Sequence, residues 1–292
     1  MPEDNSISVV NLGALSKPAD TLIKKVSNAL GGAFAPYQIK RVAKAEAEAA
    51  IIKAESEIAI TDLQRRAMHR FFDEEAKRQH NIETITEKAI PRLFDNSNPE
   101  AVEDDWVTNF FDKSRIVSDS KMQDLWSRVL AGEANSPGSY SKRTVNLMGD
   151  LDKSDAELFM KLCSFGWIIS NFTPLIFDTQ AKIYNDNGIN FGSVSHLESL
   201  GLIQFESLSG YSRQKLLKNF TVLYCSKPLQ LTMPKDADNE LTIGKVLLTR
   251  AGRELATICE SPGIPEFREY VEGQWKDFLP KKETEQDVTP NA

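Results

Sequence analysis

One helix-forming stretch constrains this chain more than any other feature. Residues 36–90 begin with a proline, which the first turn of a helix tolerates, and no Gly or further Pro follows before Pro91. Alanine, lysine and glutamate, which favour helix, alternate through the first half of the stretch. The pattern predicts one long helix, roughly 80 Å from end to end, or a hairpin of two helices. An element this slender needs a packing partner.

Two stripes of apolar and small side chains run along this stretch and predict contact with more than one neighbour. One contains Ile51, Ile58 and Phe72, spaced seven and fourteen residues apart. The other follows a near-heptad spacing and is rich in alanine, which allows helices to approach closely. We therefore predict a coiled-coil homo-oligomer, with self-association through Ile39, Val42, Ala49, Ile52, Ala59 and Leu63.

The segment before this stretch divides into a flexible start, residues 1–14, and an amphipathic helix, residues 15–34. Leu22 and Val26 belong to one apolar face of that helix, and two lysines lie opposite. The face could pack on the long helix or lie on a membrane surface. Residues 15–91 are thus expected to form an amphipathic helix followed by a long helix or helical hairpin.

Charge and cysteine content limit the class of protein. The net charge of −7 argues against a surface built for nucleic acid, which basic patches bind. Cys163, Cys225 and Cys259 are far apart and lie in apolar runs, which is typical of buried thiols in a cytosolic protein. The first residues lack the apolar core of a signal peptide, and the longest charge-free run, residues 162–177, is too short to span a bilayer. We expect a soluble, cytoplasmic protein.

Beyond Pro91 the pattern predicts a small helical domain over residues 92–150. Asn98 is the expected cap of a helix that begins at Pro99 and buries Trp106 and Phe110. A second helix follows with Leu125, Trp126, Val129 and Leu130 on one stripe, and a short third helix closes at Gly149.

A winged-helix-like α+β domain is predicted over residues 151–260. Ser154 and Glu157 have the spacing of a capping box, which would start an apolar helix that reaches Ile169. The order of helix, strand, helix, strand, loop and strand that follows is typical of a winged helix-turn-helix. A terminal helix, residues 261–279, and a disordered tail, residues 280–292, complete a mainly α fold with a long N-terminal helical rod.

Candidate sites are few. The expected recognition helix, residues 192–200, has no Arg or Lys, whereas readers of the DNA major groove commonly present these to bases. In the expected wing, residues 208–219, three basic side chains could contact an anion: Arg213, Lys215 and Lys218. No histidine or cysteine spacing matches a metal site, and no phosphate loop or catalytic set can be assembled. We assign no catalytic, cofactor-binding or metal residue and expect a protein that is not an enzyme.

Three sequence pieces carry a resemblance to a known bacterial family. They are LSKPA at residues 15–19 with IKRVAKAEA at 39–47, LWSRVLAGE at 125–133 with PGSYSKRT at 137–144, and LDKSDAELF at 151–159. Over residues 12–260 the chain resembles the uncharacterised family catalogued as domain of unknown function 2806. The middle piece also looks like a segment of abortive-infection proteins of phage defence. The resemblance implies Trp126, Leu130 and Phe159 as core, and it implies no activity.

These observations favour a non-enzymatic assembly or interaction protein, serving bacterial antiviral defence, that self-associates through the long helix and docks a protein with its C-terminal domain. Two alternatives stay open. One is a DNA-binding transcriptional regulator dimerised by the long helix, and the other is a membrane-acting effector that uses residues 15–34.

Overall fold

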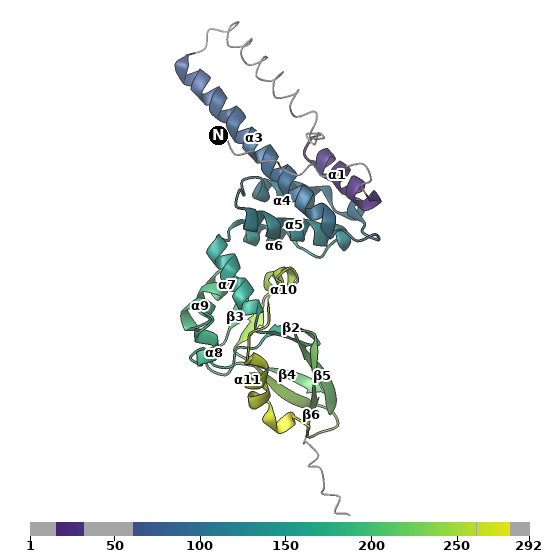
Figure 1. Ribbon diagram of the computed structural model, residues 1–292, viewed down its shortest axis with the longest axis vertical. Coiled ribbons are helices and arrows are strands. Elements are labelled where there is room, and N and C mark those ends of the chain that lie inside the picture. Colours follow the sequence, from purple (N-terminus) through teal and green to yellow (C-terminus); the bar gives the residue numbers. More distant parts are fainter. Residues whose placement is uncertain (1–15, 32–60, 261, 281–292) are drawn as a thin grey trace, which may run out of the picture. The chain divides into compact units, whose positions relative to one another are not determined.

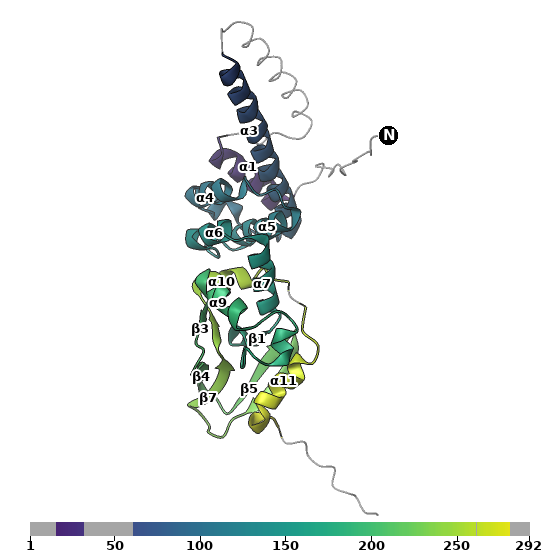
Figure 2. The ribbon, with the colours of Figure 1, turned by 90° about the vertical axis from the view of Figure 1, so that its left-hand side faces the viewer.

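The computed structural model describes residues 16–31, 61–260 and 262–280, and the chain divides into two compact units, Met1–Gly149 and Asp150–Ala292 (Figures 1 and 2). Helices and small antiparallel sheets make up its regular structure. Ile39, Val42, Ala49, Ile52 and Ala59, which the sequence assigns to self-association, lie outside the described residues, as do the expected flexible start and most of the polar tail.

The first unit is helical. Its elements are α1 (Lys17–Ala29), α3 (Asp62–Ala89), the 3-10 turns η2 (Ile90–Arg92) and η3 (Pro99–Ala101), α4 (Asp104–Ser114), α5 (Ser120–Asn135) and α6 (Lys142–Gly149). Helix α3 packs on α5, and α4 packs on α6. Trp106, Phe110 and Trp126 form the centre: the Trp106 ring stacks on Phe110 at 5.1 Å, and Trp126 meets Phe110 edge-on at 5.1 Å.

Helix α1 uses its apolar face inside this unit. Ser16 caps the helix by accepting a hydrogen bond from the Ala19 backbone N–H. Leu22 and Val26 are buried, and α1 packs on α4 and η3. The face that could have met a membrane surface is therefore covered by protein, with α4 and η3 packed against the helix.

The long stretch is interrupted at Thr61. Its backbone is extended, and its hydroxyl accepts from the N–H of Gln64 while the Gln64 side chain accepts from the N–H of Thr61. This capping box begins α3 and excludes an uninterrupted helix across residue 61. The spacing of Thr61 and Gln64 matches a capping box, but the strong helix propensity of the residues on both sides favoured one continuous helix.

One further boundary in the first unit differs from expectation. Pro99 opens only the short 3-10 turn η3, and the Asn98 side chain makes no cap hydrogen bond. The helix that buries Trp106 begins later, at Asp104. Expected core positions Trp126 and Leu130 are confirmed, each at most 1% exposed.

The second unit combines helices with three small antiparallel sheets. The helices are α7 (Lys153–Cys163), α8 (Lys182–Asn185), α9 (Phe191–Ser199), α10 (Arg250–Ala256), α11 (Phe267–Gln274) and the 3-10 turn η4 (Lys276–Phe278). The strands are β1 (Gly166–Ile169), β2 (Asn171–Pro174), β3 (Ile203–Phe205), β4 (Tyr211–Leu216), β5 (Asn219–Tyr224), β6 (Lys227–Thr232), β7 (Asn239–Gly244) and β8 (Val246–Leu248). They form the sheets β2-β1-β5-β6, β3-β8 and β4-β7.

Aromatic side chains fill the core of this unit. Trp167 of β1 stacks on Tyr224 of β5 at 5.1 Å and meets Trp275 edge-on at 5.5 Å. Phe267 of α11 contacts Phe165 at 4.8 Å, so the terminal helix is part of the core and not an appendage. Phe159 is confirmed as core at 3% exposed.

Several local expectations in the second unit are wrong. The capping box at the start of α7 joins Asp152 and Asp155, not Ser154 and Glu157. The helix ends at Cys163, and Ile168 and Ile169 lie in strand β1. The expected wing contains strand β4, which pairs with β7. At the helix end and in the expected wing, strand pairing with distant residues outweighs the local pattern, whereas the capping box is displaced by two residues within the same turn.

Candidate functional site

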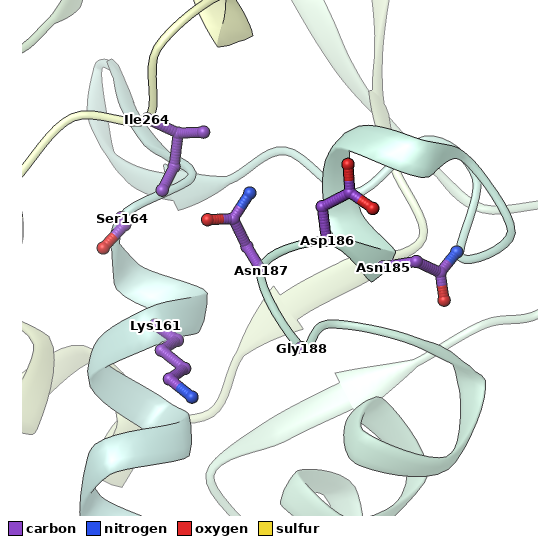
Figure 3. Close-up of a pocket in the computed structure, with 7 residues that line it drawn as sticks. All are labelled: Lys161, Ser164, Asn185, Asp186, Asn187, Gly188 and Ile264. Atoms are coloured by element: carbon purple, nitrogen blue, oxygen red, sulfur yellow. The ribbon is translucent and has the colours of Figure 1, made fainter.

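The described surface offers a small open pocket of about 470 Å³ in the second unit (Figure 3). In the figure the Lys161 side chain extends from α7 toward the turn at Gly188, and Asn187 projects between Ile264 and Asp186. The full lining is Lys161, Ser164, Asn185, Asp186, Asn187, Gly188 and Ile264.

Several polar groups around this pocket hold its walls together. The Asn187 amide donates to the Ile183 carbonyl at 2.9 Å. Behind the pocket the Tyr224 hydroxyl donates to the Ser164 carbonyl at 3.0 Å and accepts from the Ile264 N–H at 2.6 Å. Burial raises the pKa of Tyr224 to about 12, so this phenol stays protonated as a structural bridge. The Ser164 hydroxyl donates to the Met160 carbonyl at 3.3 Å, so among the described lining residues this hydroxyl is bonded to the backbone and not to a side-chain base.

A histidine–aspartate pair links two helices of the second unit. His196 Nε2 of α9 lies 2.7 Å from Asp155 Oδ1 of α7, and the second Asp155 oxygen accepts from the Asp152 N–H. The hydrogen bond to His196 is the main reason that the pKa of Asp155 is lowered; burial acts in the opposite direction. Sequence spacing gives no sign of this pair, because its members are 41 residues apart. With Asp155 also capping α7, the pair acts as a structural clasp.

The three basic residues proposed for anion contact do not form one open cluster. Arg213 donates to the Ile169 carbonyl at 3.2 Å and to the Asn171 side-chain oxygen at 2.9 Å, tying β4 to the β1–β2 hairpin. Lys218 pairs with Asp236 at 3.0 Å. Lys215 is exposed at a register shift of β4, with φ of 59°. The arginine has a structural task that the sequence did not reveal.

The cysteines have three different environments. Cys163 is 3% exposed, and the thiol of Cys259 beside it, together with burial, raises the pKa of Cys163 well above its ordinary value. Cys225 is exposed, so the expectation of a buried thiol is wrong at this position. Among the described residues, no cluster of His, Cys, Asp or Glu side chains is arranged to hold a metal ion.

The clearest candidate is the first part of α3. All buried residues of this 28-residue helix lie between Asn81 and Ala89. Before them Leu63 is 68%, Phe71 58% and Phe72 41% exposed, and the rings of Phe71 and Phe72 touch edge-to-face at 5.8 Å. Leu63 is the one predicted self-association residue that the structure describes. Phe71 and Phe72 thus form an exposed aromatic pair, and large exposed apolar patches are typical of interaction sites.

Comparison with known proteins adds a family but no activity. A family model described as a protein of unknown function (DUF2806) matches residues 65–272. Neither curated proteins nor solved structures give a match to the chain. In the part of the chain that the structure describes, no helix has both the length and the apolar character needed to cross a membrane.

Proposed function

Because the chain belongs to the DUF2806 family, whose function is unknown, we propose a function from the structure: a non-enzymatic assembly protein that self-associates through α3. The observation that carries the proposal is the bare first part of α3, with Leu63, Phe71 and Phe72 exposed on a helix whose last part is fully packed. Leaving two phenylalanines in water forgoes roughly 1.5–3 kcal/mol each, which association would recover.

The second unit would serve as a winged-helix-like docking module for a protein. Three helices, α7, α8 and α9, precede strand β3, which pairs with β8 in the register Ile203 to Leu248. Helix α9 contacts α7 and β3, as the third helix of such a module does. Its exposed end carries Phe191, 58% exposed and in ring contact with Phe205, and no Arg or Lys. This favours a protein partner over DNA.

Light scattering across a concentration series tests self-association. The full chain is expected to form an oligomer at micromolar concentration, and the double variant Phe71→Ser/Phe72→Ser should shift it toward monomer. Phe94→Ser is the matched control, because Phe94 is 64% exposed elsewhere in the same unit. A wild-type chain that stays monomeric throughout would overturn the proposal.

Filter-binding measurements of DNA affinity over a series of salt concentrations test whether the second unit is a protein-docking module or part of a transcriptional regulator. We expect weak DNA binding that does not change in the triple variant Arg213→Ala/Lys215→Ala/Lys218→Ala. A steep negative dependence of affinity on salt that becomes shallower in this variant would instead support the regulator.

We further propose that the assembly serves bacterial anti-phage defence, because residues 125–144 look like a segment of abortive-infection proteins. Expression of the chain should lower the efficiency of plating of at least one phage in a panel, and the Phe71→Ser/Phe72→Ser variant should restore it. Unchanged plating across the panel would count against this role without affecting self-association.

A further inference from the structure

We propose that Cys163 and Cys259 are a redox-active pair of thiols, which a hydroperoxide converts to a disulfide within the chain. The two residues belong to different elements of the second unit: Cys163 is the last residue of α7, and Cys259 follows the end of α10 by three residues. Both are free thiols, and their side chains are hydrogen-bonded to each other. The inference does not depend on the proposed self-association, which concerns the first unit.

Tyr224 fixes the two cysteine-bearing segments beside each other. Its hydroxyl donates to the Ser164 carbonyl at 3.0 Å, directly after Cys163. The same hydroxyl accepts from the Ile264 N–H at 2.6 Å, five residues after Cys259. Because one side chain bonds both segments, the end of α7 and the connection from α10 to α11 lie side by side. A disulfide needs its two backbones to be close before the sulfurs can join, and this arrangement provides that closeness.

The two thiols differ in exposure, which gives them different roles. Cys163 is 3% exposed, whereas Cys259 is half-buried and donates to the Leu255 carbonyl at 3.4 Å. The hydrogen bond with Cys259, together with burial, raises the pKa of Cys163 well above its ordinary value, so this thiol stays protonated. Cys259 is therefore the thiol that meets the oxidant, and Cys163 is the neighbour that reacts with the oxidised sulfur.

The seam between the two segments is open to small solutes. Ser164 and Ile264, which Tyr224 bridges, both line the open pocket of about 470 Å³ (Figure 3). Hydrogen peroxide is far smaller than this volume, so the pocket gives it access to the place where the segments meet.

The reaction balances with hydrogen peroxide as the oxidant. The Cys259 thiolate attacks one peroxide oxygen, the O–O bond breaks, and the departing hydroxide takes up the proton of the Cys259 thiol as water. Cys259 is then a sulfenic acid. The Cys163 sulfur attacks the sulfenic sulfur, so the S–S bond forms, the S–O bond breaks, and the departing hydroxide leaves with the Cys163 proton as a second water. One peroxide thus takes two electrons from the two thiols, and an added dithiol reverses the step by exchange.

The disulfide joins α7 to the segment that leads into α11. Helix α11 contributes Phe267 to the core, where its ring lies 4.8 Å from that of Phe165, two residues after Cys163. The crosslink closes a loop of about 95 residues, and a long loop restricts the unfolded chain more than a short one does. Oxidation should therefore stabilise the second unit.

Peptide mapping of the full chain after treatment with equimolar hydrogen peroxide tests the pair. Each cysteine lies in a different tryptic peptide, so a digest without reductant distinguishes every pairing. We expect a crosslink between Cys163 and Cys259 within one chain, which dithiothreitol removes. Cys225→Ser is the matched control and should leave the crosslink unchanged, because Cys225 is an exposed thiol outside the pair. A digest with no crosslink, or with one that involves Cys225 or joins two chains, would overturn the proposal.

Two variants test the assigned roles. Cys163→Ala should leave a sulfenic acid on Cys259 that dimedone traps, because the thiol that reacts with it is gone. Cys259→Ser should leave Cys163 unmodified, since this sulfur is buried. If Cys163→Ala does not fold, Cys259→Ser alone decides the roles. Dimedone on Cys163 in that variant would overturn the assignment of Cys259 as the thiol that meets the oxidant.

Thermal unfolding measures the effect of the crosslink. The oxidised chain is expected to have a melting temperature at least about 5 °C above that of the reduced chain. Cys225→Ser should show the same difference between oxidised and reduced chain, and Cys259→Ser should show none. An oxidised wild type that melts no higher than the reduced chain would contradict a disulfide that fits the native fold.

Discussion

The two parts of helix α3 share one helix and one face, but they have different surroundings. Residues 81–89 pack on α5, with Ile85 and Ala89 fully buried, whereas residues 62–80 contain no buried side chain. Helix propensity is at least as high in the exposed part, which is rich in Arg, Glu and Gln, as in the packed part, which contains Ile82, Thr84, Ile85 and Thr86. The difference shows that a sequence can favour helix formation without determining whether the helix is buried, because burial also requires a partner surface.

The test with the largest expected effect compares alanine substitutions on the same face of α3 in its packed part and in its exposed part. Ile85→Ala should lower the free energy of unfolding by about 2–5 kcal/mol, because it leaves a cavity against α5. Phe71→Ala, although it removes a larger side chain, should change it by less than about 0.5 kcal/mol in the monomer. Urea unfolding at low protein concentration measures both. Equal effects would mean that the bare stretch is covered within one chain.

A polar contact gives the second test. The Asn81 amide donates to the Arg115 carbonyl at 2.8 Å, and Gln123 donates to the Asn81 oxygen at 3.1 Å, all where α3 begins to pack. Asn81→Ala should cost about 1–3 kcal/mol, because buried groups lose their partners. Gln64→Ala, on the exposed part, is the comparison and should cost less. A smaller loss at Asn81 than at Gln64 would contradict this account of where packing starts.

The capping box of α7, unlike that of α3, contains titratable side chains, so its contribution to stability depends on pH. Asp155 caps α7 and has a lowered pKa through its hydrogen bond with His196, so its contribution to stability is complete above the ordinary aspartate pKa of 3.8 and is lost as the pH falls through the lower pKa of the folded state. Asp155→Asn should cost on the order of 1 kcal/mol at neutral pH and flatten the acid limb of a stability–pH curve. His196→Ala should flatten the same limb. A limb unchanged by both substitutions would exclude the clasp.

The smallest expected effect is at the start of α3. Thr61→Ala removes a cap worth about 0.5–2 kcal/mol to the local helix. Because the following residues are not packed, we expect faster amide exchange over residues 62–70, and global unfolding unchanged within about 0.5 kcal/mol. If Thr61→Ala instead lowered the global free energy of unfolding by the full contribution of the cap, the start of α3 would unfold together with the rest of its unit.

Features that depend on neighbours in sequence were predictable. The apolar stripe with Trp126 and Leu130 gave both the helix and its buried face, because the period of a helix places these residues together. The cap of α10 is of the same local kind, because the Thr249 hydroxyl accepts from the Gly252 N–H at 3.1 Å, three residues on. The winged-helix order was proposed without α8, since four residues carry too little pattern to be seen.

For the candidate site, the sequence placed Leu63 and Phe72 in a helix, as the structure does, but it could not say which part of the helix is exposed. Periodicity marks an apolar face, and only the folded chain shows whether α5 reaches it. The structural clasp of Asp155 and His196 could not be predicted from the sequence for a similar reason, because its two residues are 41 positions apart.

The sequence by itself determined most of the helices and their apolar faces, because those depend on contacts within a few residues. Tertiary structure decided the rest. Ile168 and Ile169 became strand because β2 and β5 lie beside them, residues 211–216 became strand because β7 pairs with them, and Arg213 was drawn to the Ile169 carbonyl. Such contacts join residues far apart along the chain, so their free energy exists only once the chain has folded.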